Sequence, residues 1–160
     1  MSNEMTAVSA QITALLDSHH VMSLATVCSD APHAANLFYA RDGFSLMWVS
    51  DASSRHSVMV EADPRVAATI TKDYVDFPEI QGLQIFGRAF RVVDRLSRQH
   101  ARRRLEARYP FLHDAANAPK EIRDALELGQ FYRLEPSKIV LIDNTRGFGF
   151  KQTLEFGPNT

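Results

Sequence analysis

The sequence contains only one cysteine, Cys28, and only one tryptophan, Trp48. A single cysteine excludes an internal disulfide and any metal site built from several cysteines, as is typical of proteins in a reducing compartment. The chain also lacks an uninterrupted apolar run near the roughly 20 residues that a membrane helix requires, and its N-terminus lacks the pattern of a signal peptide. We therefore expect a cytoplasmic protein without a membrane segment.

An excess of either charge is also missing. Lys and Arg number 18 against 19 Asp and Glu, which gives a formal net charge of -1. Such a balance favours neither nucleic acid nor an anionic membrane as a partner of the whole molecule. The length of 160 residues and the 45% share of hydrophobic residues predict a single domain, residues 1–160, with a substantial core.

Familiar catalytic signatures are absent. The chain has no nucleophile elbow, no Walker loop, no dinucleotide fingerprint and no metal-spaced pair of His and Glu. His19 and His20 have no third ligand at a recognisable spacing, so no metal is expected. Cys28 ends an apolar strand, a position more typical of a buried thiol than of a nucleophile. Redox or other difficult chemistry would therefore require a cofactor.

Hydrophobic periodicity predicts mainly β structure with peripheral helices. Strands are expected at residues 21–27, 33–39, 44–49, 66–71, 81–93, 131–134 and 139–142, the last two divided by a turn at residues 135–138. Helices are expected at about residues 3–17, 54–62, 95–109 and 119–129. Sequential strands joined by short turns favour a barrel, because a closed sheet leaves few open edges.

The stretch from strand 44–49 to the helix near residue 54 has an unusual charge pattern. Arg55 and His56 stand where the helix macrodipole is already positive, which costs about 0.3 to 1 kcal/mol per charge. A phosphate bound by the first-turn amides, the hydroxyls of Ser53 and Ser54, and Arg55 would reverse that cost. The alternative is that Ser53 or Ser54 only caps the helix and Arg55 pairs with Asp51.

The predicted helix at residues 95–108 is rich in arginine and has a thin apolar face. Such a helix could lie along a nucleic-acid backbone, where each neutralised phosphate releases counterions. The alternative, which we favour, is a solvated face whose arginines pair with Glu106, Glu121 and their neighbours. No aromatic residues interleave with the arginines to stack on bases.

Several segments together resemble the pyridoxamine 5'-phosphate oxidase-like FMN-binding split barrels, over about residues 10 to 145. The segments that carry the resemblance are residues 32–39, 42–43, 48–50, 54–56, 63–67 and 82–87. Residues 143–149 are similar to the ending of the uncharacterised YhbP-like branch. The resemblance implies a six- or seven-stranded split β-barrel at about residues 21–143, followed by a Gly-Phe-Gly segment and tail at residues 144–160.

The resemblance also implies FMN, held at the interface of a homodimer. The strand at residues 35–39 would lie along the flavin ring, mainly through its main chain, and the start of the helix at residue 54 would hold the phosphate. The implied cofactor residues are Ala35, Asn36, Leu37, Phe38, Tyr39, Trp48, Val49, Ser50, Ser54, Arg55, His56 and Gln84, with Gln81 as an alternative to Gln84. His33 and Arg146 are implied substrate contacts, with Tyr39 as a further polar group.

Two departures from the family pattern limit what the resemblance implies. His56 stands where the oxidases usually carry lysine, and a neutral imidazole offers a phosphate only one hydrogen bond. The oxidases' terminal tryptophan and Arg-x-His-x-Arg segment are replaced by residues 144–149, so oxidation of pyridoxamine phosphate is not expected. We expect a flavin-dependent oxidoreductase acting on a small molecule. The alternative is a carrier or sensor that binds heme or flavin without turnover. It is suggested by this chain's Gly-Phe-Gly ending, which resembles that of heme-handling relatives of the same barrel.

Overall fold

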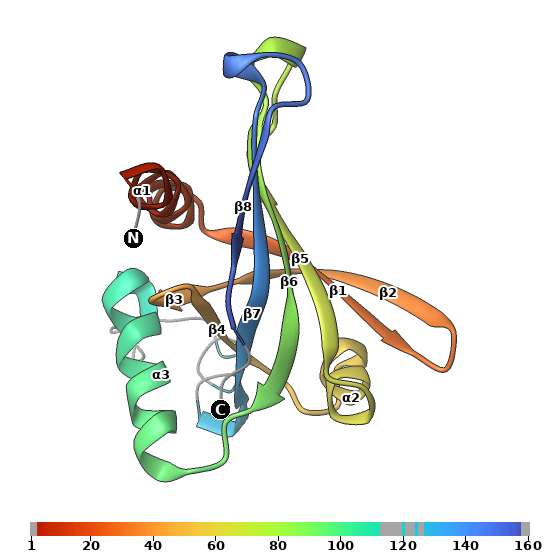
Figure 1. Ribbon diagram of the computed structural model, residues 1–160. Coiled ribbons are helices and arrows are strands. Elements are labelled where there is room, and N and C mark those ends of the chain that lie inside the picture. Colours follow the sequence, from red (N-terminus) through yellow and green to blue (C-terminus); the bar gives the residue numbers. More distant parts are fainter. Residues whose placement is uncertain (1–2, 113–119, 121–123, 125–126, 158–160) are drawn as a thin grey trace.

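The computed structural model describes residues 3–112, 120, 124 and 127–157. Eight of its strands form one antiparallel sheet in the order β2-β1-β5-β6-β7-β4-β3, and β8 pairs with β7 outside this path. The strands are β1 Val21–Cys28, β2 Ala31–Phe38, β3 Ala40–Asp42, β4 Ser45–Ser50, β5 Arg65–Thr71, β6 Gln81–Arg91, β7 Gln130–Asp143 and β8 Lys151–Glu155. The sheet twists and curls strongly (Figure 1), which confirms the predicted mainly β class.

Three α-helices in the described part of the chain lie at the edges of this sheet (Figure 1). They are α1 Asn3–Ser18, α2 Arg55–Ala62 and α3 Arg95–Arg108, and the short 3-10 helices are η1 Phe77–Glu79, η2 Pro110–Leu112 and η3 Asn144–Arg146. Most of the helix predicted at residues 119–129 lies outside the described residues. Among the described helices, none has the length and apolar character needed to cross a membrane.

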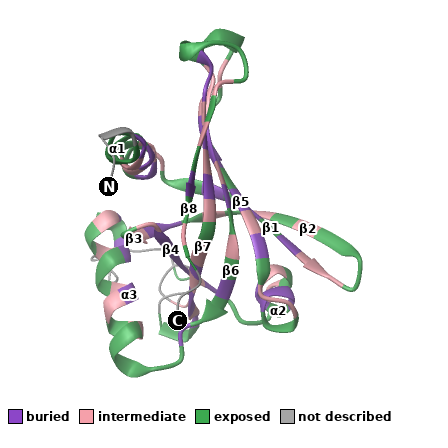
Figure 2. Ribbon diagram, in the orientation of Figure 1, coloured by how far each residue is buried: buried purple, intermediate pink, exposed green. Residues whose placement is uncertain are grey.

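The core follows from the alternation of buried and exposed residues along the strands. In β1, Met22, Leu24 and Thr26 are buried while their neighbours at 21, 23 and 25 are exposed. Val8 and Ile12 of α1 are also buried, as the helical spacing predicts. Figure 2 shows the buried residues gathered in the strands, whereas the helices carry exposed outer faces. One face of the sheet therefore faces a core and the other faces outward.

Strand β7 corrects the prediction of two strands divided by a turn. It runs continuously from Gln130 to Asp143, and Pro136 pairs with Gly87 where the register of β6 shifts between Phe86 and Gly87. Proline cannot donate a ladder hydrogen bond, but it is tolerated at a bulge. The sequence Glu135-Pro136-Ser137 reads as a turn by composition, and only the partner strand supplies the bulge that keeps it extended.

The far ends of β6 and β7 form a narrow protruding tip (Figure 1). Here η1 and η3 lie together: the rings of Phe77 and Phe148 are 5.0 Å apart, and Asn144 Nδ2 donates to the carbonyl of Phe77 at 3.2 Å. The chain then returns as β8, a strand within the C-terminal segment that the sequence did not predict. Phe148 of the Gly-Phe-Gly segment is exposed.

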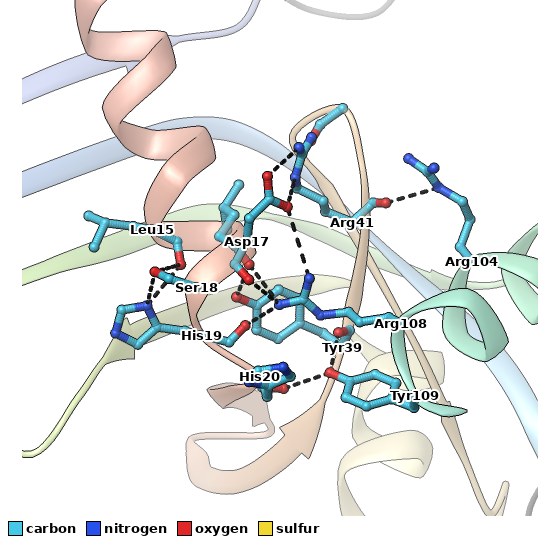
Figure 3. A network of polar contacts seen from close by, with 12 residues as sticks. Leu15, Asp17, Ser18, His19, His20, Tyr39, Arg41, Arg104, Arg108 and Tyr109 are labelled. Atoms are coloured by element: carbon cyan, nitrogen blue, oxygen red, sulfur yellow. Dashed lines mark hydrogen bonds and ion pairs between the residues drawn. The ribbon is translucent and has the colours of Figure 1, made fainter. Parts of the chain in front are cut away.

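The arginine-rich helix α3 is tied to the end of α1 by Arg108 (Figure 3). Arg108 Nη2 donates to the carbonyls of Leu16 at 3.0 Å and Asp17 at 3.1 Å, and also to that of His19. Its guanidinium lies over the ring of Tyr39, 5.4 Å from the centroid. A cation at the carbonyl end of a helix interacts favourably with the macrodipole. Arg108 therefore caps α1 from another element.

Other arginines of α3 are also paired within the described chain. Arg102 lies 3.7 Å from Glu106, as expected for a helix pair four residues apart. Arg104 lies 3.5 Å from Asp42 and donates to the carbonyl of Arg41 at 3.1 Å. Glu121, the other predicted partner, lies outside the described residues. Much of the charge of α3 is thus used inside the molecule rather than spread along a free face.

Candidate functional site

A cluster of hydroxyls and one imidazole forms where β4 ends and α2 begins. Ser50 closes β4, and its Oγ lies 2.8 Å from His56 Nε2. Ser54 Oγ lies 3.1 Å from the same nitrogen and 2.8 Å from Ser57 Oγ. Ser57 was not predicted, although its position three residues after Ser54 on a helix places it on the same face. The strand–loop–helix order along the sequence is what brings these four side chains together.

The start of α2 lacks a side-chain cap. Ser54 is the N-cap, but its side chain makes no capping bond; instead its Oγ donates to the carbonyl of Asp51 at 2.8 Å. Asp51 accepts from Ser53 and not from Arg55. Arg55 is exposed, with no hydrogen bond or ion pair to the described residues. Ser54 therefore occupies the N-cap position, as the alternative has it, but the Asp51–Arg55 pair is not formed and the first-turn amides have no side-chain acceptor.

His33 also belongs to this region, on the face of β2 that α2 covers. It pairs across the strands with Thr26, whose Oγ1 lies 3.5 Å from Met59 Sδ of α2. Burial lowers the pKa of His56, and the nearby His33 lowers it further. The site therefore favours the neutral imidazole of His56, which can donate to or accept from these serines.

This lowered pKa makes stability depend on His56 at mildly acidic pH. The folded chain resists protonation of His56, whereas the unfolded chain takes up a proton near the ordinary pKa of about 6.5. The stability that the protein gains from keeping His56 neutral should therefore be complete above that pH. The free energy of unfolding should fall as the pH drops through it. Urea unfolding of the flavin-free protein at neutral and acidic pH should show a smaller pH-dependent loss in His56→Gln.

His20→Gln, which changes an exposed loop histidine, is the matched control and should keep the pH dependence of the parent protein. If His56→Gln loses as much stability on acidification as the parent does, the protonation of His56 is not what destabilises the fold.

A second group of predicted residues lies on the outer face of the sheet. Asn36 pairs with Ser23, Ser23 with Thr69, and Thr69 with Gln84, so the four form one row across β2, β1, β5 and β6. Ser23 Oγ donates to Asn36 Oδ1 at 2.6 Å. The adjacent row consists of Ala34, Ala25 and Ala67, and continues on β6 with the exposed Phe86. Over β2, β1 and β5 the side chains of this second row are therefore small.

Among the described strands, β2 is the last at its end of the sheet, so that one of its edges has no partner strand there. Its main-chain groups pair with β1 on one side only, from Ala31 to Phe38. Ala35 and Leu37 turn toward the α2 side, where they are half-buried, and Phe38 is exposed on the other side. An unpaired strand edge offers main-chain donors and acceptors to a ligand, the mode of contact implied for residues 35–39.

Two aromatic residues that were expected to contact the cofactor have their side chains in the core. Tyr39 is fully buried and donates from its hydroxyl to the carbonyl of Leu16 at 2.8 Å. Trp48 is 1% exposed and stacks on Tyr132 at a centroid distance of 5.6 Å. Val49 is half-buried against the cluster that contains Phe131. The side chains of Tyr39 and Trp48 fill the core, so within this chain they cannot touch a bound flavin.

Arg146 lies at the protruding tip, at the opposite end of the molecule from α2 (Figure 1). It donates to Gln152 at 3.1 Å, and its guanidinium is 4.1 Å from the ring centroid of Phe150. Gln81 lies near the same tip and donates to Asp143 at 2.9 Å. Within one chain Arg146 and His33 therefore do not meet. The α2 cluster and the row with Asn36 and Gln84 also lie on opposite faces of the sheet.

Comparisons with known proteins agree with this architecture. The family model described as pyridoxamine 5'-phosphate oxidase matches residues 8–142. The UPF0306 protein plu4501 of Photorhabdus laumondii is 29% identical over 138 residues, which cover 85% of this chain and 87% of that protein.

Solved structures share the fold at low identity. An FAD-binding protein of Mesorhizobium loti has a TM-score of 0.64 at 17% identity, covering 87% of this chain and 92% of that one. The heme storage protein HutZ of Vibrio cholerae has a TM-score of 0.65 at 16% identity, covering 79% and 88%. These likenesses support the curled, split-barrel form of the sheet. The chain belongs to the pyridoxamine 5'-phosphate oxidase family and has its split-barrel fold.

Proposed function

We propose that this protein binds FMN and works in the cytoplasm as a flavin-dependent oxidoreductase on a small molecule. The observation that carries the proposal is the open start of α2. There Ser50, Ser54 and His56 converge beside uncapped amides, and the exposed Arg55 stands at the same helix end. Placing positive charge at a helix N-terminus costs about 0.3 to 1 kcal/mol, and a bound phosphate turns that cost into an attraction.

The donor set fits a phosphate monoester. Serine hydroxyls and backbone amides donate to phosphate oxygens, and a guanidinium can donate two parallel hydrogen bonds. The neutral His56 can add a donor, or a charge if the phosphate raises its pKa again. The ordinary chemistry of FMN, once bound, is hydride or electron transfer at its ring.

The proposed assembly is a homodimer with the cofactor between two copies. A single chain holds the α2 cluster on one face and Asn36 with Gln84 on the other, so two copies are needed to bring both kinds of group to one flavin. The small side chains of Ala34, Ala25 and Ala67 and the open edge of β2 suit contact with the ring and with a second subunit. This chain's own role would be to orient substrate against the ring and to exclude water.

A second candidate function is binding of heme or flavin without turnover. HutZ, a heme storage protein, shares the fold, and Phe148 between two glycines is exposed at the tip as a surface for a planar ligand. The visible absorption spectrum of the purified protein separates the candidates, because flavin and heme absorb differently. Oxidation of pyridoxamine phosphate is not proposed, since the Arg-x-His-x-Arg segment is missing from the sequence.

The decisive experiment compares FMN with riboflavin. In Arg55→Ala, FMN should bind about ten- to hundred-fold more weakly, because a charged hydrogen bond contributes about 1.5 to 3 kcal/mol. Riboflavin carries the same ring without a phosphate, so its affinity should barely change. His56→Ala should weaken FMN in the same direction by a smaller factor. Affinities can be measured by the quenching of flavin fluorescence on binding.

Arg103→Ala is the matched control, because it removes an exposed arginine from α3, away from the cluster. If Arg55→Ala leaves FMN binding intact, or weakens both flavins equally, the phosphate does not bind at α2.

A further inference from the structure

We propose that a groove along the first two turns of α3 is a second anion site, which binds the phosphate groups of a small organic phosphate. Arg95, Arg98 and Arg102 line it, with Val93, Gln99 and Phe131 as the remaining described lining residues. Its volume is about 270 Å³. The spacing of three and four residues puts the three arginines on one face of the helix. No carboxylate is among these described lining residues, although Arg102 also lies 3.7 Å from Glu106, one turn further along the helix.

The start of α3 carries one carboxylate of its own, the N-cap Asp94, against the three arginines of the groove. The first turn of α3 contains no acidic residue, and it carries Arg95 where the macrodipole is positive. The N-cap carboxylate of Asp94 is already engaged, since it accepts from the amide of Ser97 at 2.8 Å. The start of α3 therefore differs from that of α2: it is capped by a carboxylate, and its arginines line a groove.

Phe131 holds two of the guanidiniums in place. The guanidinium carbons of Arg98 and Arg102 lie 6.0 and 5.9 Å from the centroid of its ring. Phe131 itself is 2% exposed, so the ring is a fixed floor rather than a mobile side chain. Arg98 Nη1 also donates to Gln130 Oε1 at 3.3 Å. Planar guanidiniums that are oriented before binding lose less freedom when they grip a phosphate.

The site fits a small molecule better than a nucleic acid. Arg95 and Arg102 are separated by about 10 Å along the helix axis, given a rise of about 1.5 Å per residue. The basic stripe does not continue, because Arg104 and Arg108 turn toward Asp42 and the end of α1. Single-stranded nucleic acids are held by aromatic side chains that stack on bases, and the ring of Phe131 is buried.

The groove is separate from the α2 cluster but connected to it through one strand pair. Gln130, which accepts from Arg98, pairs across the sheet with Ser50, and Ser50 Oγ contacts His56. None of the groove's lining residues belongs to the α2 cluster, so the groove can bind its ligand whether or not FMN binds at α2.

Calorimetric titration with inorganic pyrophosphate at low ionic strength tests the groove. Pyrophosphate should bind the parent protein, and Arg98→Ala should weaken that binding about ten- to hundred-fold, as expected for loss of a charged contact. Arg95→Ala, which changes an exposed side chain, should act in the same direction even if Arg98→Ala folds poorly. Arg103 is exposed on α3 but does not line the groove, so Arg103→Ala should leave the affinity for pyrophosphate unchanged.

Arg55→Ala distinguishes this site from the proposed flavin-phosphate site. Pyrophosphate binding that persists in Arg55→Ala and is lost in Arg95→Ala supports the groove. Binding that is lost in Arg55→Ala and unaffected by Arg95→Ala and Arg98→Ala overturns it. A single-stranded oligonucleotide that binds more tightly than pyrophosphate, and loses affinity in the groove variants, would overturn the assignment to a small molecule.

Discussion

Gly87→Ala should destabilise the fold by about 3 kcal/mol or more, because the bulge between β6 and β7 has no room for a methyl group. A Cβ at this position would stand 2.2 Å from the carbonyl oxygen of Glu135 and 2.9 Å from Cα of Pro136. Both neighbours are main-chain atoms of the paired strand, so they cannot rotate away. Urea unfolding followed by far-UV circular dichroism measures the loss.

Gly157→Ala is the matched control, since a Cβ there would meet nothing within 4 Å. Its effect should stay within about 0.5 kcal/mol, the usual range for surface changes. Equal stability of Gly87→Ala and the parent protein would show that β6 and β7 do not approach this closely.

Arg108→Ala should cost about 2 to 3 kcal/mol of stability, the scale of hydrogen bonds to a charged group. The change removes the Arg108 donor from the carbonyls of Leu16, Asp17 and His19 at the end of α1, and of these Leu16 still accepts from the hydroxyl of Tyr39. It also removes the cation over the ring of Tyr39. Thermal or urea unfolding reports the loss, and proteolysis near residue 18 should become faster as α1 detaches.

Arg108→Lys tests whether the planar geometry of the guanidinium matters for stability. An ammonium is a point charge and cannot reproduce planar donation to several carbonyls, so this variant should fall between the parent and Arg108→Ala. Arg103→Ala, an exposed arginine of the same helix, should be close to neutral. If Arg103→Ala and Arg108→Ala are equally mild, the contact in Figure 3 does not hold α1 to α3.

Local sequence patterns predicted much of the fold because the residue spacing and composition within most helices and strands are enough to identify them. The α1 spacing, the strand from Ser45 to Ser50 and the start of α2 at Arg55 all lie within one or two residues of the prediction. What failed depended on distant partners. Pro136 could be recognised as a strand residue only by knowing that Gly87 faces it across a bulge.

In the candidate site, too, the local arrangement was predictable and the part that depends on distant elements was not. Ser50, Ser54 and His56 are six residues apart at most, so a strand, a loop and a helix suffice to bring them together. The burial of Tyr39 and Trp48 could not be predicted, because either face of a strand can hold an aromatic residue and the choice depends on which elements cover it. Arg146 lies at the tip because β6 and β7 extend beyond the rest of the sheet, a length that no single segment reveals.

The stacked pair of Trp48 and Tyr132 also gives the protein an internal optical reporter. Trp48 is the single tryptophan of the sequence and is shielded from water in the hydrophobic core. Its emission therefore reports on the core alone, without a second indole on the surface to obscure the signal. Unfolding should move that emission toward longer wavelengths, and a flavin bound nearby should quench it by energy transfer, so one signal can follow both events.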